Sequence, residues 1–274
     1  MSQHWNLAQF HWDDVTPAAV DQDLLETVKT AALVEANSAD YVIYLRNVFA
    51  DDEAFKAAAD EWGKEEALHG AALARWAVTV DPSFDFPAAL ARFRRGYRLP
   101  LAASTSVRGS RSGELVARCV VESGTCSFYS AIRDHSSDAV LREICQRIAQ
   151  DEARHYRLFE THLQRYLQTD PLSWLARLKV AWGRVAEADD DELAYAFYSA
   201  NVPADTAVYE RRRHANAYWR RAMKLYRPQH LHSLARMVLK AAGLRLEGRP
   251  LRLTLACLWW GLQRRLRRLS AAPH

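Results

Sequence analysis

Two pairs of residues in this sequence combine a carboxylate and an imidazole at helical spacing. Glu66 precedes His69 by three positions, and Glu152 precedes His155 by the same distance. Residues three apart lie on one face of a helix, so each pair can direct both side chains at one point. Each pair therefore offers two ligands to a metal ion.

A lone glutamate precedes each pair at a matching distance. Glu35 lies 31 residues before Glu66, and Glu122 lies 30 residues before Glu152. Such a distance separates two facing positions on consecutive helices of an antiparallel helical hairpin. The chain therefore repeats one pattern, in which a helix with a glutamate is followed by a helix with Glu-x-x-His.

The neighbours of these residues at the same helical phase are apolar or small. Four carboxylates buried together would be very unfavourable without cations, and two divalent ions would bring four positive charges. Oxygen-rich ligands with two imidazoles suit iron or manganese better than zinc or copper. Carboxylate bundles with two iron or manganese ions use this ligand pattern. Each residue alone could be a surface glutamate or an ordinary histidine, but all six in register predict a metal site. The predicted ligands are Glu35, Glu66, His69, Glu122, Glu152 and His155.

An acidic residue immediately precedes each Glu-x-x-His pair. A metal-bound histidine commonly donates its second N–H to a carboxylate. We therefore expect Asp151 to accept a hydrogen bond from His69. By the approximate twofold symmetry between the two Glu-x-x-His helices, Glu65 should accept one from His155. The alternative is that both acids are solvated on a helix surface.

Glycine and proline are scarce around these residues, which favours helices. The predicted helices are residues 17–49, 52–79, 112–134 and 137–168. Thr16 and Pro17 form a typical helix start. Residues 81–111 contain three prolines and are predicted to be irregular. Two helices, a long connection and two further helices are the pattern of a four-helix bundle.

Further helices are predicted after this bundle, at residues 171–188, 190–201, 204–226, 228–242 and 250–269. No segment shows the alternation of a strand, so the predicted fold class is all-α. We expect a four-helix bundle over residues 17–168. A helical extension with a basic tail is expected over residues 171–274.

The net charge of +4 conceals an uneven distribution. From Arg211 to the C-terminus there are sixteen Lys/Arg and one acid, so the preceding 210 residues carry a net charge of −11. Residues 250–268 join an apolar segment with Trp259 and Trp260 to four arginines. Such a composition is typical of an amphipathic helix on an anionic membrane surface. The alternatives are docking of an acidic carrier protein, a helix that packs on the body, and, less favoured, contact with nucleic acid.

The four cysteines have neither metal-finger spacing nor a dense framework, which favours a reducing compartment. The N-terminus lacks a basic start followed by an apolar run, and no segment of about 18 apolar residues occurs. We therefore expect neither a secretory signal nor a membrane-spanning helix. The expected location is the cytoplasm, with the inner face of the membrane as an additional place of contact.

The motifs resemble those of the soluble di-iron oxidases of the ferritin-like superfamily, most closely the acyl-carrier-protein desaturases. Residues 65–70 (EEALHG) are similar to that family's Glu-Glu-x-x-His-Gly motif, with Trp62 shortly before it. Residues 151–155 (DEARH) resemble its Asp-Glu-x-Arg-His motif, and residues 122–125 (ESGT) resemble Glu-x-x-Thr. The match covers roughly residues 20–165. The family's arginine before the first histidine is Leu68 here, and the chain is shorter than a typical desaturase.

This resemblance implies a ferritin-like bundle in which the six ligands hold two iron ions, or manganese in one or both positions. It makes Thr125 a candidate for proton relay, with a helix-packing hydroxyl as the alternative. The implied function is an O2-dependent non-haem di-iron oxidase, desaturase-like or hydroxylase-like, acting on a hydrophobic, lipid or carrier-bound substrate.

An external electron donor such as a ferredoxin is expected, because no flavin or dinucleotide motif is visible. A homodimer is left open. The alternative function is a ferroxidase or peroxidase of the ferritin or rubrerythrin class. The additional helices and the cysteine spacing weigh against it.

Overall fold

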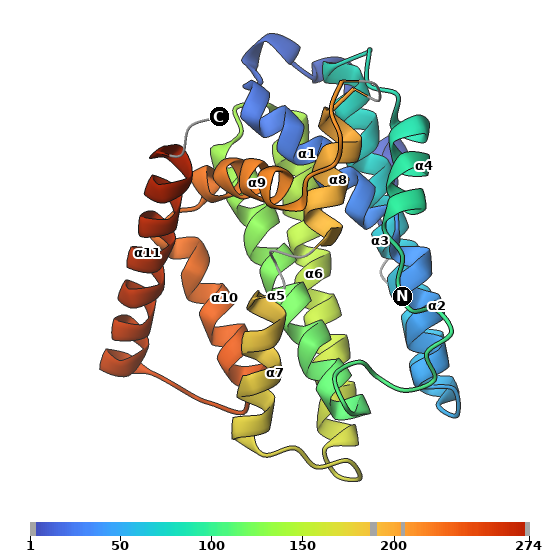
Figure 1. The fold of residues 1–274 in the computed structure, drawn as a ribbon, viewed down its shortest axis with the longest axis vertical. Helices are drawn as coiled ribbons and strands as arrows, with labels where there is room; N and C mark the ends of the chain where they lie inside the picture. Colours follow the sequence, from blue (N-terminus) through green and yellow to red (C-terminus); the bar gives the residue numbers. More distant parts are fainter. Residues whose placement is uncertain (1–3, 187–190, 204–205, 272–274) are drawn as a thin grey trace.

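The protein is all helical (Figure 1). The computed structural model describes residues 4–186, 191–203 and 206–271, and these ranges contain helices and no strand, which confirms the all-α fold class. Three short 3-10 turns lie before residue 20. The α-helices are α1 (Gln22–Glu35), α2 (Ser38–Val48), α3 (Glu53–Val80), α4 (Phe86–Gly96), α5 (Arg111–His135), α6 (Ala139–Tyr166), α7 (Trp174–Ala186), α8 (Asp191–Asn201), α9 (Arg211–Leu225), α10 (Pro228–Ala241) and α11 (Gly248–Ala271).

Four helices surround the centre of the molecule. α1 lies beside α3, α5 lies beside α6, and α3 and α6 join the two pairs. α3 and α6 have 28 residues each, so each is about 42 Å long. α2 continues from the end of α1 and also packs against α3.

The start of each of these four helices is fixed by a side chain that accepts a backbone N–H. Asp21, Asp52, Ser110 and Asp138 do so for α1, α3, α5 and α6, respectively. Acidic residues and serine are favoured there because they satisfy an N–H that has no partner within the helix. Asp138 also accepts from Trp76 Nε1 at 3.0 Å and from the backbone of Thr16 at 2.8 Å. It therefore ties α6 to α3 and to the N-terminal segment.

The prediction of one helix over residues 17–49 is wrong. Pro17 begins a 3-10 turn instead of a long helix, and the helix that follows is interrupted immediately after Glu35. Asn37, with φ −91° and ψ 8°, separates α1 from α2 and is buried. Helical spacing continues across the break in the sequence, so periodicity alone does not reveal it.

The prediction that residues 81–111 are irregular is also wrong in part, because they contain α4. Asp85 caps this helix by accepting from Ala88 N, and Pro87 lies in its first turn. Proline is favoured at this position, because its missing N–H would have no helical partner there. The proline therefore marks the start of a helix and not its absence.

The later helices cover the outside of the four central ones. α8 packs on α1 and α4, α9 packs on α8 and α1, and α7 and α10 both pack on α5. α9 begins at Arg211 and not at residue 204. The helices predicted over residues 171–188, 190–201 and 204–226 also include residues 187–190 and 204–205, which lie outside the described residues. Among the described helices, none has the length and apolar character required to cross a membrane.

Gly70 on α3 permits the close approach of the α1–α2 break. A Cβ at this position would lie 2.6 Å from the backbone nitrogen of Ala36 and 2.9 Å from its Cα. We expect Gly70→Ala to lower the free energy of unfolding by about 1–3 kcal/mol, because backbone would have to shift. Urea denaturation followed by circular dichroism measures this change.

Gly183→Ala on α7 is the matched control. A Cβ at Gly183 meets no atom within 4 Å. The free energy of unfolding of this variant should rise by about 0.5–1 kcal/mol, because alanine loses less backbone entropy than glycine when it folds into a helix. A Gly70→Ala variant that is as stable as Gly183→Ala would contradict the close approach.

Candidate metal centre

The four central helices bring all six predicted ligands together. Glu35 is the last residue of α1, and Glu122 lies in the middle of α5. Each Glu-x-x-His pair occupies one turn of α3 or α6. The six side chains form two overlapping groups whose ligand atoms lie within 4.8 Å of one another. The first group is Glu35, Glu66, His69 and Glu152, and the second is Glu66, Glu122, Glu152 and His155.

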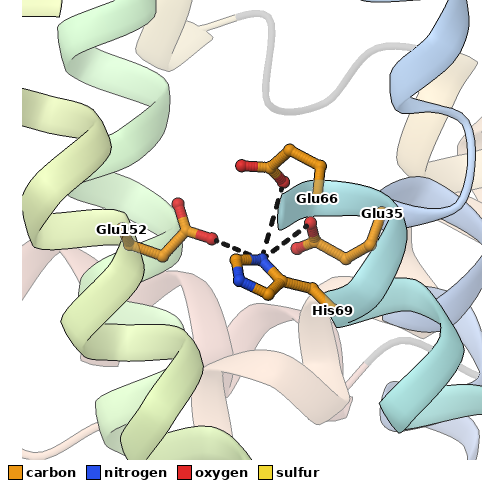
Figure 2. Close-up of side chains that lie close together, drawn as sticks. All are labelled: Glu35, Glu66, His69 and Glu152. Carbon is orange, nitrogen blue, oxygen red and sulfur yellow. Dashed lines mark ion pairs between the residues drawn. The ribbon is translucent and has the colours of Figure 1, made fainter. Parts of the chain in front are cut away.

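Each histidine directs its Nδ1 atom at carboxylates. Figure 2 shows His69 surrounded by three of them: Nδ1 lies 3.3 Å from Glu152, 3.8 Å from Glu66 and 3.9 Å from Glu35. The Nδ1 atom of His155 lies 2.9 Å from the second carboxylate oxygen of Glu66, Oε1, and 3.6 Å from Glu122. The carboxylates of Glu66 and Glu152 thus lie between the two imidazoles.

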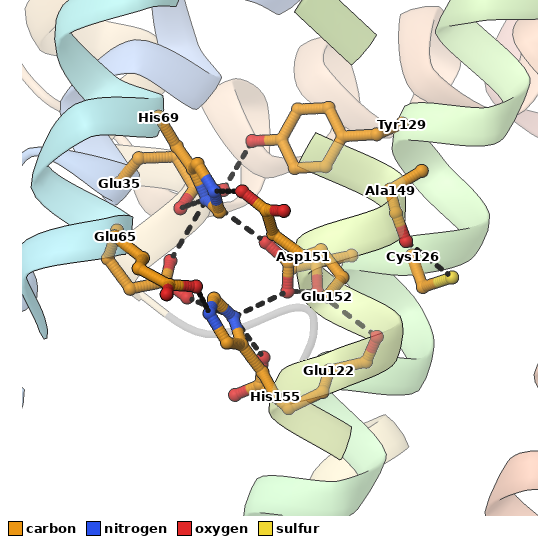
Figure 3. A network of polar contacts seen from close by, with 12 residues as sticks. Glu35, Glu65, His69, Glu122, Cys126, Tyr129, Ala149, Asp151, Glu152 and His155 are labelled. Carbon is orange, nitrogen blue, oxygen red and sulfur yellow. Dashed lines mark hydrogen bonds and ion pairs between the residues drawn. The ribbon is translucent and has the colours of Figure 1, made fainter. Parts of the chain in front are cut away.

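The Nε2 atom of each histidine faces a further acid, as expected from the sequence. In His69 it lies 3.0 Å from Asp151 Oδ2, and in His155 it lies 2.8 Å from Glu65 Oε2 (Figure 3). A carboxylate can only accept, so each Nε2 carries a proton and donates it. In the neutral imidazole Nδ1 then has a lone pair directed at the inner glutamates, which is the arrangement a metal ligand requires.

The inner atoms of the cluster have no hydrogen-bond partner in the part of the chain that the structure describes. They are fully shielded from solvent, although several lie within ion-pair distance of one another. Buried polar atoms normally make hydrogen bonds, and leaving them unpaired is unfavourable. These buried glutamates and histidines therefore fit a metal ion. The atoms concerned are His69 Nδ1, His155 Nδ1, Glu66 Oε1, Glu122 Oε1 and Glu152 Oε1.

The directions of the pKa shifts in the cluster follow from burial and from the crowding of its carboxylates. Burial raises the pKa of Glu35 and of Glu122 well above the usual range, and neighbouring glutamates raise it further. Burial opposes protonation of His69 and His155, but the surrounding carboxylates outweigh it and raise both pKa values. Protons thus offset part of the negative charge. A divalent cation would offset it in their place.

Two hydroxyl groups of α5 contact the inner glutamates. Thr125 Oγ1 donates to Glu152 Oε2 at 2.6 Å, and it also lies 3.2 Å from the backbone oxygen of Val121. The first contact places Thr125 beside a predicted ligand, while its role in proton relay stays a prediction. Tyr129 Oη donates to Glu35 Oε1 (Figure 3). Sequence reasoning missed this tyrosine, although it follows Glu122 by seven residues and so lies on the same face of α5.

The N-terminal segment covers the histidine side of the cluster. Trp5 is 9% exposed, donates from Nε1 to Asp151 Oδ2 at 2.7 Å, and stacks on the ring of His69 at 5.9 Å. His4 adds a third group of potential ligands with Glu65 and Asp151. The guanidinium of Arg154 already pairs with both of these acids, however. His4, Glu65 and Asp151 therefore form an outer layer of the cluster. No spacing rule could have revealed Trp5, because 146 residues separate it from its partner.

Asp151→Asn should weaken metal binding without unfolding the protein. The asparagine has nearly the same shape but lacks the negative charge that favours the Nε2–H of His69. We expect the affinity for ferrous iron to fall about 10- to 100-fold, as is typical when such a partner is removed. Anaerobic calorimetric titration measures the affinity. Glu143→Gln on the same helix, where the side chain is 43% exposed, is the control and should bind iron as the wild type does. Equal affinities in the two variants would count against His69 as a ligand.

Comparison with known proteins provides no family for this chain. No protein-family model matches it. A search of curated proteins also finds no match.

Proposed function

We propose that this protein is a ferritin-like, O2-dependent, non-haem di-iron oxidase that acts on a hydrophobic substrate. In this proposal α1 with α2, α3, α5 and α6 form the four-helix bundle. One observation carries the proposal: two groups of buried ligand atoms overlap and share Glu66 and Glu152. A site for a single ion would need only one such group.

The residues divide into two sets of ligands. Glu35 and His69 would bind only the first ion, and Glu122 and His155 only the second. Glu66 and Glu152 belong to both groups and would help to hold both ions. Mostly oxygen donors with one imidazole for each ion favour iron, with manganese as the alternative. When bound, two ferrous ions supply electrons that reduce O2, and the oxidised centre can take hydrogen from an unactivated C–H bond.

The surrounding side chains hold the ligands and the protons. Asp151 and Glu65 fix the tautomer and the orientation of the imidazoles by accepting from Nε2. Tyr129 Oη donates to the carboxylate of Glu35, and Thr125 Oγ1 donates to Glu152 Oε2 at 2.6 Å. Both hydroxyls thus contact glutamates that would hold the ions.

The substrate is expected on the side of the cluster away from the N-terminal segment. Trp5 and Asp151 cover the ring of His69 on one side. Figure 3 shows Tyr129 and Cys126 across the cluster from Glu65. Tyr129 and Ala149 belong to the apolar core, so a substrate in contact with them would be hydrophobic. The reaction also requires electrons from an external donor.

Metal content tests the proposal directly. Protein loaded with ferrous iron without oxygen should retain two irons per chain, with the Mössbauer spectrum of a coupled pair after oxidation. Glu122→Ala should lose the second iron, because it removes a ligand of that ion alone. Glu143→Ala, on the exposed side of α6, should retain both. A wild-type content well below two, unchanged by Glu122→Ala, would refute the di-iron centre.

Loading with excess ferrous iron in air separates an oxidase from a storage protein. We expect iron uptake to saturate at two per chain while O2 is consumed. A ferritin-class ferroxidase would continue to take up iron far beyond that number. Measuring the iron retained after gel filtration, together with O2 consumption, distinguishes the two functions.

A further inference from the structure

Helix α11 carries an exposed apolar row along the side that faces away from the protein. Leu253 is 68% exposed and Trp260 is 61% exposed, although both are large hydrophobic side chains. They are seven residues apart and lie on the same face of the helix. Exposed arginines precede and follow them on this face. We call this surface the outer face of α11; it comprises Arg249, Leu253, Trp260, Arg264 and Arg267.

The opposite face of α11 attaches the helix to the protein. Leu251 is buried, and the guanidinium of Arg265 lies 5.1 Å from the ring centre of Trp219 on α9. α11 packs on α9 and α10 and lies at the edge of the molecule (Figure 1). The outer face therefore has solvent in front of it and is accessible to a broad partner.

The arginines of the outer face are available for such a partner. Arg249, Arg264 and Arg267 make no ion pair with any residue in the described ranges. Arg264 instead lies over the ring of Trp260, with Cζ 5.1 Å from its centre. This places a cation beside the most exposed aromatic residue of the helix. A tryptophan next to unpaired arginines matches the boundary between lipid acyl chains and anionic headgroups.

We propose that the outer face of α11 binds an anionic membrane surface. Leu253 and Trp260 would enter the headgroup region, while the arginines contact lipid phosphates. Because the apolar side chains protrude from a helix at the edge of the molecule, a broad, deformable lipid surface can take up all of them at once. The charge of this part of the chain is complementary to anionic lipid. The inference does not rest on the metal centre.

Sedimentation of the full chain with vesicles tests this proposal. The wild type should bind vesicles of phosphatidylcholine and phosphatidylglycerol but not phosphatidylcholine alone. Binding should weaken when salt rises from about 0.1 M to about 1 M, because screening shortens the range of the charges. Replacing both Arg264 and Arg267 by glutamine should lower partitioning about fivefold for each arginine. Trp260→Ala should lower it about tenfold, with the loss persisting at high salt.

Trp182→Ala provides the matched control. Trp182 is 72% exposed, but it lies on α7, outside the proposed surface. This variant should bind vesicles as the wild type does, and all variants should keep wild-type helicity and iron content. Wild-type protein that does not bind the anionic vesicles would overturn the proposal, including when it binds an acidic protein instead. A loss in Trp182→Ala equal to that in Trp260→Ala would also overturn it.

Discussion

Four glutamates share the interior of this protein, and compensation of their negative charge is the constraint on which the rest of the structure depends. Each of Glu35, Glu66, Glu122 and Glu152 is at most 7% exposed. Carboxylates in such surroundings must be protonated, paired with cations or bound to metal. Two imidazoles alone cannot neutralise four carboxylates, even when both are protonated. A cluster of this composition is therefore stable only with additional protons or with metal ions, and ions satisfy the unpaired inner atoms as well.

The outer layer of the cluster follows from the same constraint. An imidazole that directs Nδ1 inward must donate Nε2–H outward, so Asp151 and Glu65 stand behind the two histidines. These acids need partners in turn. Arg154 bonds to both of them, at 2.6 Å and 3.2 Å, and Trp5 donates to Asp151. The N-terminal segment is thus held in place by a chain of charges and hydrogen bonds that starts at the glutamates.

The sequence predicted which six side chains lie together better than it predicted where the helices begin and end, and the reason is physical. Glu-x-x-His spacing is a local property of a helix, and the all-α class follows from composition and periodicity. The break after Glu35 depends instead on the contact between Gly70 and Ala36, which lie 34 positions apart. α4 was missed because the proline in its first turn was interpreted as a helix breaker. Trp5 reaches Asp151 only through the tertiary fold, whereas Tyr129 had a signal in its spacing from Glu122.

The uneven charge of the chain acquires a structural meaning from the pairing of its basic residues. In α9, Arg221 lies 3.1 Å from Asp23 and 2.7 Å from Glu26, and in α10, Lys240 pairs with Glu160. These cations offset acids of the central helices and attach α9 and α10 to them. The arginines of the outer face of α11 form no ion pair with the described acids. They are therefore free to pair with an anionic partner. The exposed arginines of the outer face form no ion pairs within the described ranges, and exposed ion pairs would in any case add little to stability. The stability of the fold therefore does not explain why these arginines lie beside Leu253 and Trp260. The proposed binding of an anionic membrane would account for both features.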